Sequence, residues 1–149
     1  MPTVEKVVRT DAGLASELRL SVMRLRRRLA GERHPDNELS LGSMAVLGCL
    51  FRHGELTIGD LAGHERVQPP SMTRTVKCLE EGGFLTRRPH ETDGRQVLVA
   101  LTVSGRARLL ADRARRDAWL ATRLRDLTPD ERETLRRAAP ILERLATND

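Results

Sequence analysis

The hydrophobic pattern of this chain changes from a helical period to a strand-like one at Gly82, and this change limits the folds open to it. Before Gly82, apolar residues recur every three or four positions in two short segments joined by a turn at Val67-Gln68. After it, two strand-like segments flank a loop of turn-forming residues. The predicted helices span residues 58–64 and 69–81, the strands 84–88 and 96–101, and the loop 89–95. A helix, a turn, a second helix and a β-hairpin therefore follow one another directly.

Longer helical segments surround this central part, over residues 14–29, 41–53, 103–127 and 129–147. Ser40, Thr57 and Thr128 each precede a predicted helix, at the position where a hydroxyl side chain caps the first turn. Pro69 opens the helix over 69–81, where the missing amide hydrogen of proline costs nothing. Gly82 and Gly83 end that helix.

This order predicts a mainly α protein with a small β-hairpin wing, which is a winged helix-turn-helix arrangement. We expect a single domain over residues 1–149, with the winged lobe at 38–102 and dimerisation helices at 10–33 and 103–147. The outer helices carry more apolar surface than so small a lobe covers, so a homodimer is favoured over a monomer whose ends fold back on the core. The expected interface residues are Leu14, Leu18, Trp119, Ile141, Leu142 and Leu145.

The charge of the chain indicates a polyanionic partner. The formal net charge is +5, and the segment 66–79 holds three basic residues and no acidic one, whereas 126–149 holds four basic residues against six acidic ones. Aromatic residues make up only 2% of the chain, which argues against a protein that stacks RNA or single-stranded bases on its rings. Double-stranded DNA is the partner that fits.

In a winged helix-turn-helix the second helix lies in the major groove and its exposed side chains meet bases and phosphates. Arg74 suits a bidentate contact to guanine, and Ser71 or Thr73 suits a base or a phosphate. Arg95, at the hairpin tip, suits a narrow minor groove, with Asp93 as wing support; the alternative is an ordinary surface turn with a loose ion pair. The full predicted DNA-binding set is Gln68, Ser71, Met72, Thr73, Arg74, Lys77, Arg87, Arg88 and Arg95.

The segment from Leu39 to Arg106 resembles the core of the multiple-antibiotic-resistance regulator (MarR) family. The shared residues, in order, are Leu56-Thr57, Asp60-Leu61-Ala62, Ser71, Thr73-Arg74, Leu79-Glu80, Gly83, Arg87 or Arg88, Asp93-x-Arg95 and Leu101-Thr102-x-x-Gly105. The resemblance implies a homodimeric, mostly repressing transcription factor, with Ser71, Thr73, Arg74 and Lys77 on the recognition helix and Arg95 on the wing. It also implies a small phenolic or other aromatic effector, although the chain has no tyrosine and the ligand-binding residues stay unknown.

Two alternatives keep the same fold but change what it senses. Cys49 and His53 are four residues apart, a spacing that places two soft ligands on one helix face, but a metal site needs about two more. His34, His64 and His90 show no clustering in the sequence, so no metal and no cofactor is predicted. Oxidation of Cys78, within the recognition helix, is the thiol-responsive alternative.

Other classes of protein are disfavoured. The run His64-Glu65-Arg66-Val67-Gln68 misses the second histidine of the zinc-protease signature, and no phosphate-binding glycine loop or serine elbow occurs, so no enzyme is predicted. The longest uncharged run, 39–51, has thirteen residues, and a membrane span needs roughly 20. The start of the chain lacks the apolar region of a signal peptide, so we expect a cytoplasmic protein. A winged module that docks a protein instead of DNA remains open.

Overall fold

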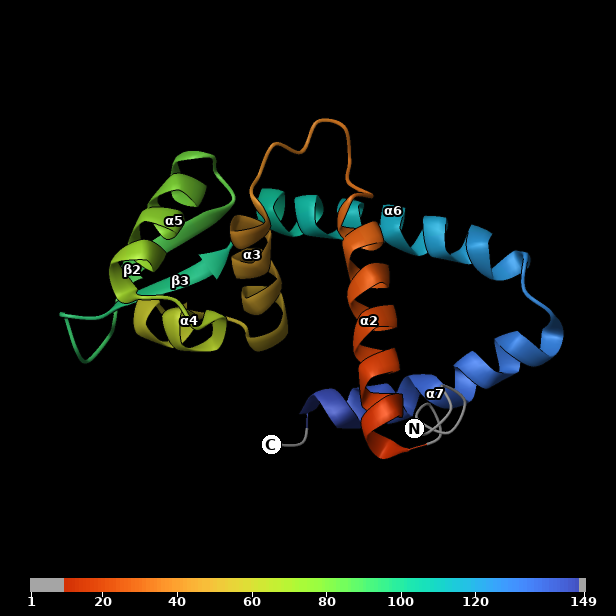
Figure 1. Ribbon diagram of the computed structural model, residues 1–149. Helices are drawn as coiled ribbons and strands as arrows, with labels where there is room; N and C mark the ends of the chain where they lie inside the picture. The colour runs from red at the N-terminus through yellow and green to blue at the C-terminus, as the bar shows by residue number, and fades with distance from the viewer. Residues whose placement is uncertain (1–9, 148–149) are drawn as a thin grey trace. The chain divides into compact units, whose positions relative to one another are not determined.

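The computed structural model describes residues 10–147, which form two compact units. Arg33–Ala114 make up one unit, and the two ends of the chain, up to Glu32 and from Arg115, make up the other. The elements, in chain order, are α2 (Asp11–Ala30), α3 (Leu41–His53), β1 (Leu56–Thr57), α4 (Ile58–Glu65), α5 (Pro69–Glu81), β2 (Leu85–Pro89), β3 (Val97–Leu101), α6 (Val103–Arg125) and α7 (Pro129–Thr147) (Figure 1). The predicted fold class, mainly helical with a small hairpin, is confirmed.

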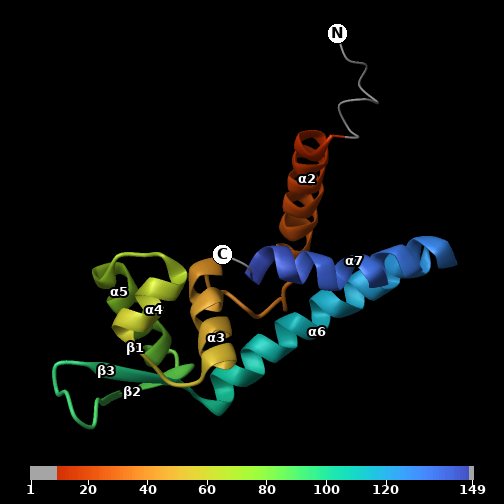
Figure 2. The ribbon, with the colours of Figure 1, turned by 90° about the horizontal axis from the view of Figure 1, so that it is seen from below.

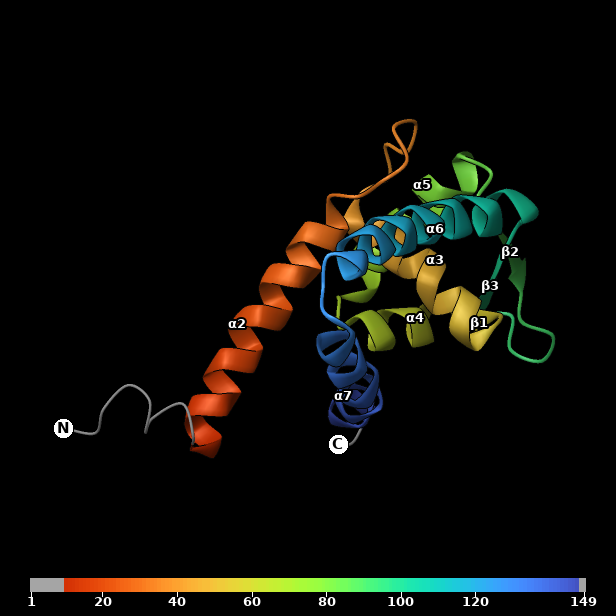
Figure 3. The same ribbon diagram turned by 90° about the vertical axis from the view of Figure 1, so that its right-hand side faces the viewer.

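The unit formed by Arg33–Ala114 holds the hydrophobic core, and α3 is its central helix. In three views α3 lies between α4 and the first turns of α6 (Figures 1, 2 and 3). The guanidinium groups of Arg106 and Arg113 on α6 lie 4.9 and 4.7 Å from the centre of the Phe51 ring on α3. This unit extends to Ala114, beyond the predicted lobe limit at residue 102. The largest fully buried core side chains are Leu47, Leu61, Leu79, Leu85, Val46, Val76 and Val99.

The sheet has three antiparallel strands in the order β1-β3-β2. Leu85 pairs with Leu101 and Pro89 with Val97, so β2 and β3 form the predicted hairpin. The loop between β2 and β3 extends away from the helices α3, α4 and α5 (Figures 1 and 2). The third strand, β1, pairs Leu56 with Val99 and was not predicted, because two residues are too few to show an alternating pattern.

Local sequence signals explain where the helices begin and end. The side chains of Ser40 and Thr57 accept hydrogen bonds from the backbone N–H groups of Ser43 and Asp60. The Thr128 hydroxyl accepts one from the N–H of Glu131 at 3.2 Å, so all three predicted caps are confirmed. α5 begins at Pro69 and is followed by Gly82 and then by Gly83, whose φ of 79° favours glycine. Two helix limits differ from the prediction by more than one residue. α2 begins at Asp11 because Thr10 caps it, and α6 ends at Arg125 instead of residue 127.

The helices at the two ends of the chain, α2 and α7, bury none of their residues within the described protein. The side chains of Leu14 and Leu145 are 49% and 67% exposed. Trp119 on α6 is half-buried, with the guanidinium groups of Arg28 and Arg123 at 4.9 and 5.4 Å from its ring. Among the described helices, none combines the length and apolar character needed to cross a bilayer.

Candidate nucleic-acid interface

The helix α5 has one buried face and one exposed polar face. Val76 and Leu79 are buried in the core, whereas Thr73, Arg74 and Lys77 are exposed. A spacing of three or four residues separates the members of each face, as a helix requires. The helix therefore presents two basic side chains and a hydroxyl in one direction.

Hydrogen bonds fix the first turn of this exposed face. The Thr73 hydroxyl donates to the Pro69 carbonyl at 3.0 Å, and the Arg74 guanidinium donates to the Ser71 hydroxyl at 3.4 Å. Gln68 is exposed at the N-cap position and its side chain makes no capping hydrogen bond. The donors and the acceptor of the Gln68 side-chain amide are therefore not used to cap α5.

Met72 corrects one part of the predicted DNA-binding set. Its side chain is only 2% exposed and belongs to the hydrophobic core. The reason is its spacing: Met72 lies four residues before Val76, on the buried face of α5. Met72 therefore packs α5 onto the core and is not available at the exposed face.

Two arginines of the strand β2 are held by carboxylates. The Arg87 guanidinium donates twice to Glu80 of α5, at 2.9 and 3.1 Å. The Arg88 guanidinium donates twice to Glu55, in the link between α3 and β1. These hydrogen bonds hold the pKa of both glutamates below its ordinary value and raise the pKa of both arginines. The sequence showed the four residues but not their pairing, which joins positions far apart in the chain.

The loop of the wing is organised by backbone hydrogen bonds. The Asp93 carboxylate accepts from the backbone N–H of Arg95 at 3.1 Å, so it supports the turn and not the guanidinium. The ring nitrogen Nδ1 of His90 accepts from the N–H groups of Thr92 and Asp93, both at 3.2 Å. The sequence could not predict this role of His90, because nothing near it distinguishes it from any other surface histidine. The Arg95 side chain is exposed at this loop.

The helix α5 and the hairpin loop border a single depression in the surface. Thr73 of α5 and Arg95 of the wing both line it, together with Thr57 at the start of α4. The remaining lining residues are Ile58, Gly59, Asp60, Arg87, Gln96 and Val97. The two parts of the predicted interface therefore belong to one continuous surface.

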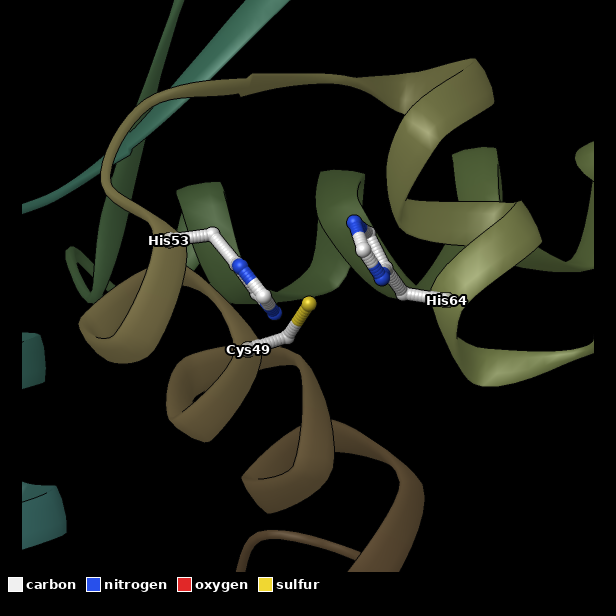
Figure 4. A group of neighbouring side chains, drawn as sticks. All are labelled: Cys49, His53 and His64. Carbon is white, nitrogen blue, oxygen red and sulfur yellow. The ribbon is translucent and has the colours of Figure 1, made fainter. Parts of the chain in front are cut away.

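A cysteine and two histidines from two neighbouring helices, α3 and α4, lie close together. Cys49 and His53 of α3 and His64 of α4 have ligand atoms within 4.8 Å of one another (Figure 4). Burial raises the pKa of the Cys49 thiol, and the charge of Glu65 adds to that effect while Arg52 opposes it. The spacing in the sequence placed Cys49 and His53 on one helix face. It gave no sign of His64, because only the fold brings α4 beside α3. Cys78 is exposed on α5.

Two helices joined by a turn, the second with an outward polar face and an antiparallel hairpin beside it, define a winged helix-turn-helix protein. The MarR family model matches residues 39–97. An HTH-type transcriptional regulator from Mycobacterium leprae is 47% identical over 133 residues, which cover 89% of this chain and 92% of the relative. The chain therefore belongs to the MarR family of transcriptional regulators.

Solved structures share the fold over nearly the whole chain. A transcriptional regulator protein from Pseudomonas aeruginosa superposes with a TM-score of 0.82 at 34% identity, covering 95% of this chain and 99% of that one. A variant of Staphylococcus aureus MepR, bound to an oligodeoxyribonucleotide, gives a TM-score of 0.66 at 20% identity, covering 91% of this chain and 98% of that one. The second likeness shows the fold alone.

Proposed function

We propose that this regulator is a homodimeric repressor that binds duplex DNA at operators with inverted-repeat symmetry. The helix α5 of each subunit enters a major groove, and the wing enters the flanking minor groove. The observation that carries the proposal is the shared surface of Thr73 and Arg95, which joins helix and wing. Within the described part of the chain, Arg74, Lys77 and Arg95 have no carboxylate partner. Their charges are therefore available to phosphates and base edges.

The proposed contacts divide by role. Arg74 reads a guanine, Lys77 meets a phosphate, and Arg95 enters the minor groove. Gln68, Ser71 and Thr73 complete the helix surface with neutral hydrogen-bonding groups. Arg87 and Arg88 take a supporting role, because DNA contact through either would have to break a two-point ion pair. The MepR variant bound to an oligodeoxyribonucleotide supports this use of the fold.

The dimer is proposed from the exposed apolar side chains of α2 and α7. Leu14, Ile141, Leu142 and Leu145 are 40–67% exposed, and a second copy of the chain covers them in the proposal. Leu18 and Trp119 are half-buried and extend the same interface. In this proposal the protein is a binding protein without enzymatic activity, acts in the cytoplasm where its DNA lies, and is released by a small phenolic or other aromatic effector.

Binding to the duplex upstream of the protein's own gene tests the proposal. We expect tight binding, measured by fluorescence anisotropy, that weakens steeply with added salt and survives competition by unrelated duplex. Arg74→Ala should cost about 1–3 kcal/mol of binding free energy and relax the preference at one base position. Arg136→Ala on α7, whose side chain is 70% exposed, removes the same charge and should leave binding unchanged.

A different result would separate the alternatives. Binding that shows neither sequence preference nor salt dependence, here and in a selection of genomic fragments, would contradict DNA as the partner. A winged module that docks a protein through an apolar surface would behave in that way. Equal losses for Arg74→Ala and Arg136→Ala would contradict the recognition role of α5.

A further inference from the structure

We propose that Cys49, His53 and His64 form a binding site for a divalent ion of the zinc class. The three side chains come from two helices, α3 and α4, that the helix-turn-helix lobe packs together. Neither the family assignment nor the proposed DNA surface uses any of them. The Cys49 sulfur points toward the space between the two imidazole rings (Figure 4).

The geometry needs only a small contraction to hold an ion. Cys49 and His53 are one helical turn apart on α3, so their side chains lie on the same face. The rings of His53 and His64 stack with their centres 4.4 Å apart and their planes 17° apart. All three ligand atoms already lie within 4.8 Å of one another. In a tetrahedral zinc site the ligand atoms are about 3.3–3.7 Å apart, given the usual Zn–N and Zn–S distances.

The side chains have room for this adjustment. His53 and His64 are exposed, so their rings can turn until a nitrogen of each points at the ion. Cys49 is buried and its position is fixed by the core. The Cys49 sulfur is therefore the fixed ligand, and the two imidazoles adjust to the ion. Water takes the fourth position, on the exposed side.

The donor set selects the class of metal. One thiolate and two imidazoles suit zinc and its neighbours, whereas magnesium and calcium prefer oxygen ligands. Binding replaces the thiol hydrogen of Cys49 with a metal–sulfur bond and releases one proton to solvent. No oxidant or other reactant is needed.

An ion at this site clamps α3 to α4, which is the helix that packs against the recognition helix α5. The ion binds the folded lobe and not the unfolded chain, so it raises the stability of the lobe. This effect does not depend on the proposed DNA binding. The site therefore adds a metal-dependent stiffening of the helix-turn-helix, whatever the operator is.

Metal titration of the reduced, chelator-treated full-length protein tests the site. We expect one Zn²⁺ per chain in competition with a chromophoric chelator, and a thiolate-to-cobalt charge-transfer band when Co²⁺ is used. His53→Gln and His64→Gln should each weaken Zn²⁺ binding by at least about tenfold, because the loss of even a residue that only orients a metal ligand costs about 10–100-fold. Cys49→Ser should abolish the charge-transfer band. Zn²⁺ should also raise the melting temperature of the wild type but not of the histidine variants.

Matched controls use the cysteine and a histidine outside the cluster. Cys78→Ser and His34→Gln should keep the Zn²⁺ affinity within about twofold and retain the charge-transfer band. The site is wrong if both cluster histidine variants bind Zn²⁺ as tightly as the wild type, or if the band survives in Cys49→Ser and is lost in Cys78→Ser. His53 and His64 are exposed, so their variants decide the question even if Cys49→Ser fails to fold. None of these readouts involves DNA, so the site and the proposed function fail independently.

Discussion

The carboxylate of Asp112 on α6 accepts a hydrogen bond from the side-chain amide of Asn37, 75 residues earlier in the chain. Asp112 is fully buried and Asn37 is 7% exposed. The same carboxylate accepts from the backbone N–H of His34 at 3.0 Å and lies 4.0 Å from the Arg33 guanidinium. One buried acid thus ties the segment before α3 to the first half of α6.

Asp112→Ala should destabilise the protein by about 2–4 kcal/mol, because it removes the oxygen acceptor of the buried Asn37 amide and of the partly buried His34 N–H and leaves Arg33 without a counter-charge. Equilibrium urea unfolding measures the loss. Asp117→Ala removes an exposed acid of the same helix and should change stability by less than about 0.5 kcal/mol. Equal stability of the two variants would refute the role given to Asp112.

Gly105→Ala should also destabilise, by roughly 3 kcal/mol. A Cβ at Gly105 would lie 1.9 Å from the backbone carbonyl oxygen of Phe84, so the helix α6 or the chain before β2 would have to move. Gly63→Ala on α4 is the matched control, because a Cβ there meets no atom within 4 Å. That variant should be neutral or stabilise by up to about 1 kcal/mol. Thermal unfolding of both proteins gives the comparison, and a harmless alanine at Gly105 would disprove the close approach.

The Glu80–Arg87 pair should make stability depend on pH. Its hydrogen bonds lower the pKa of Glu80 in the folded state. A carboxyl of this kind stabilises the fold above its unfolded pKa, about 4.3, and loses that contribution as pH falls through the lowered folded pKa. We therefore expect the stability difference between wild type and Glu80→Gln to be constant above about pH 5 and to shrink in acid. Urea unfolding at a series of pH values measures it.

Glu81→Gln is the control for this titration. Glu81 is the next residue, is exposed, and makes no ion pair among the described residues. Its stability difference from the wild type should vary much less over the same pH range. A difference for Glu80→Gln that grows as pH falls would have the wrong sign for a stabilising pair.

Leu145→Glu should weaken self-association. The Leu145 side chain is 67% exposed in the single chain, and a partner that covers it would have to bury the new carboxylate. Sedimentation velocity should show dimer for the wild type and a shift to monomer for the variant. Arg136→Glu, a charge change on the same helix, should leave the dimer intact. If Leu145→Glu forms a dimer with wild-type affinity, Leu145 does not belong to the interface.

Local signals in the sequence predicted the helices and the hairpin well. Ser40, Thr57 and Pro69 marked helix starts that the structure confirms. These signals work because a cap or a proline acts within three or four residues of its position. The family resemblance rested on the same central segment, and the comparisons confirm it.

Relationships between distant residues could not be read in this way. Arg88 finds Glu55 across 33 residues, and His64 joins Cys49 only after α4 packs on α3. The burial of Met72 follows from its spacing to Val76, although its two neighbours in the sequence are polar. The contacts that decide which charges and ligands are available are tertiary, and no periodicity encodes them.

The pairing of Arg87 and Arg88 with carboxylates removes both guanidinium groups from the free basic charge that the chain offers a nucleic acid. A guanidinium already neutralised by a carboxylate displaces no condensed cations from a nucleic acid. Each phosphate contact contributes about 0.9 to the slope of log affinity against log salt concentration. In the proposed complex that slope should therefore not count Arg87 or Arg88, and the number of ions released will be smaller than the arginine content of the chain implies.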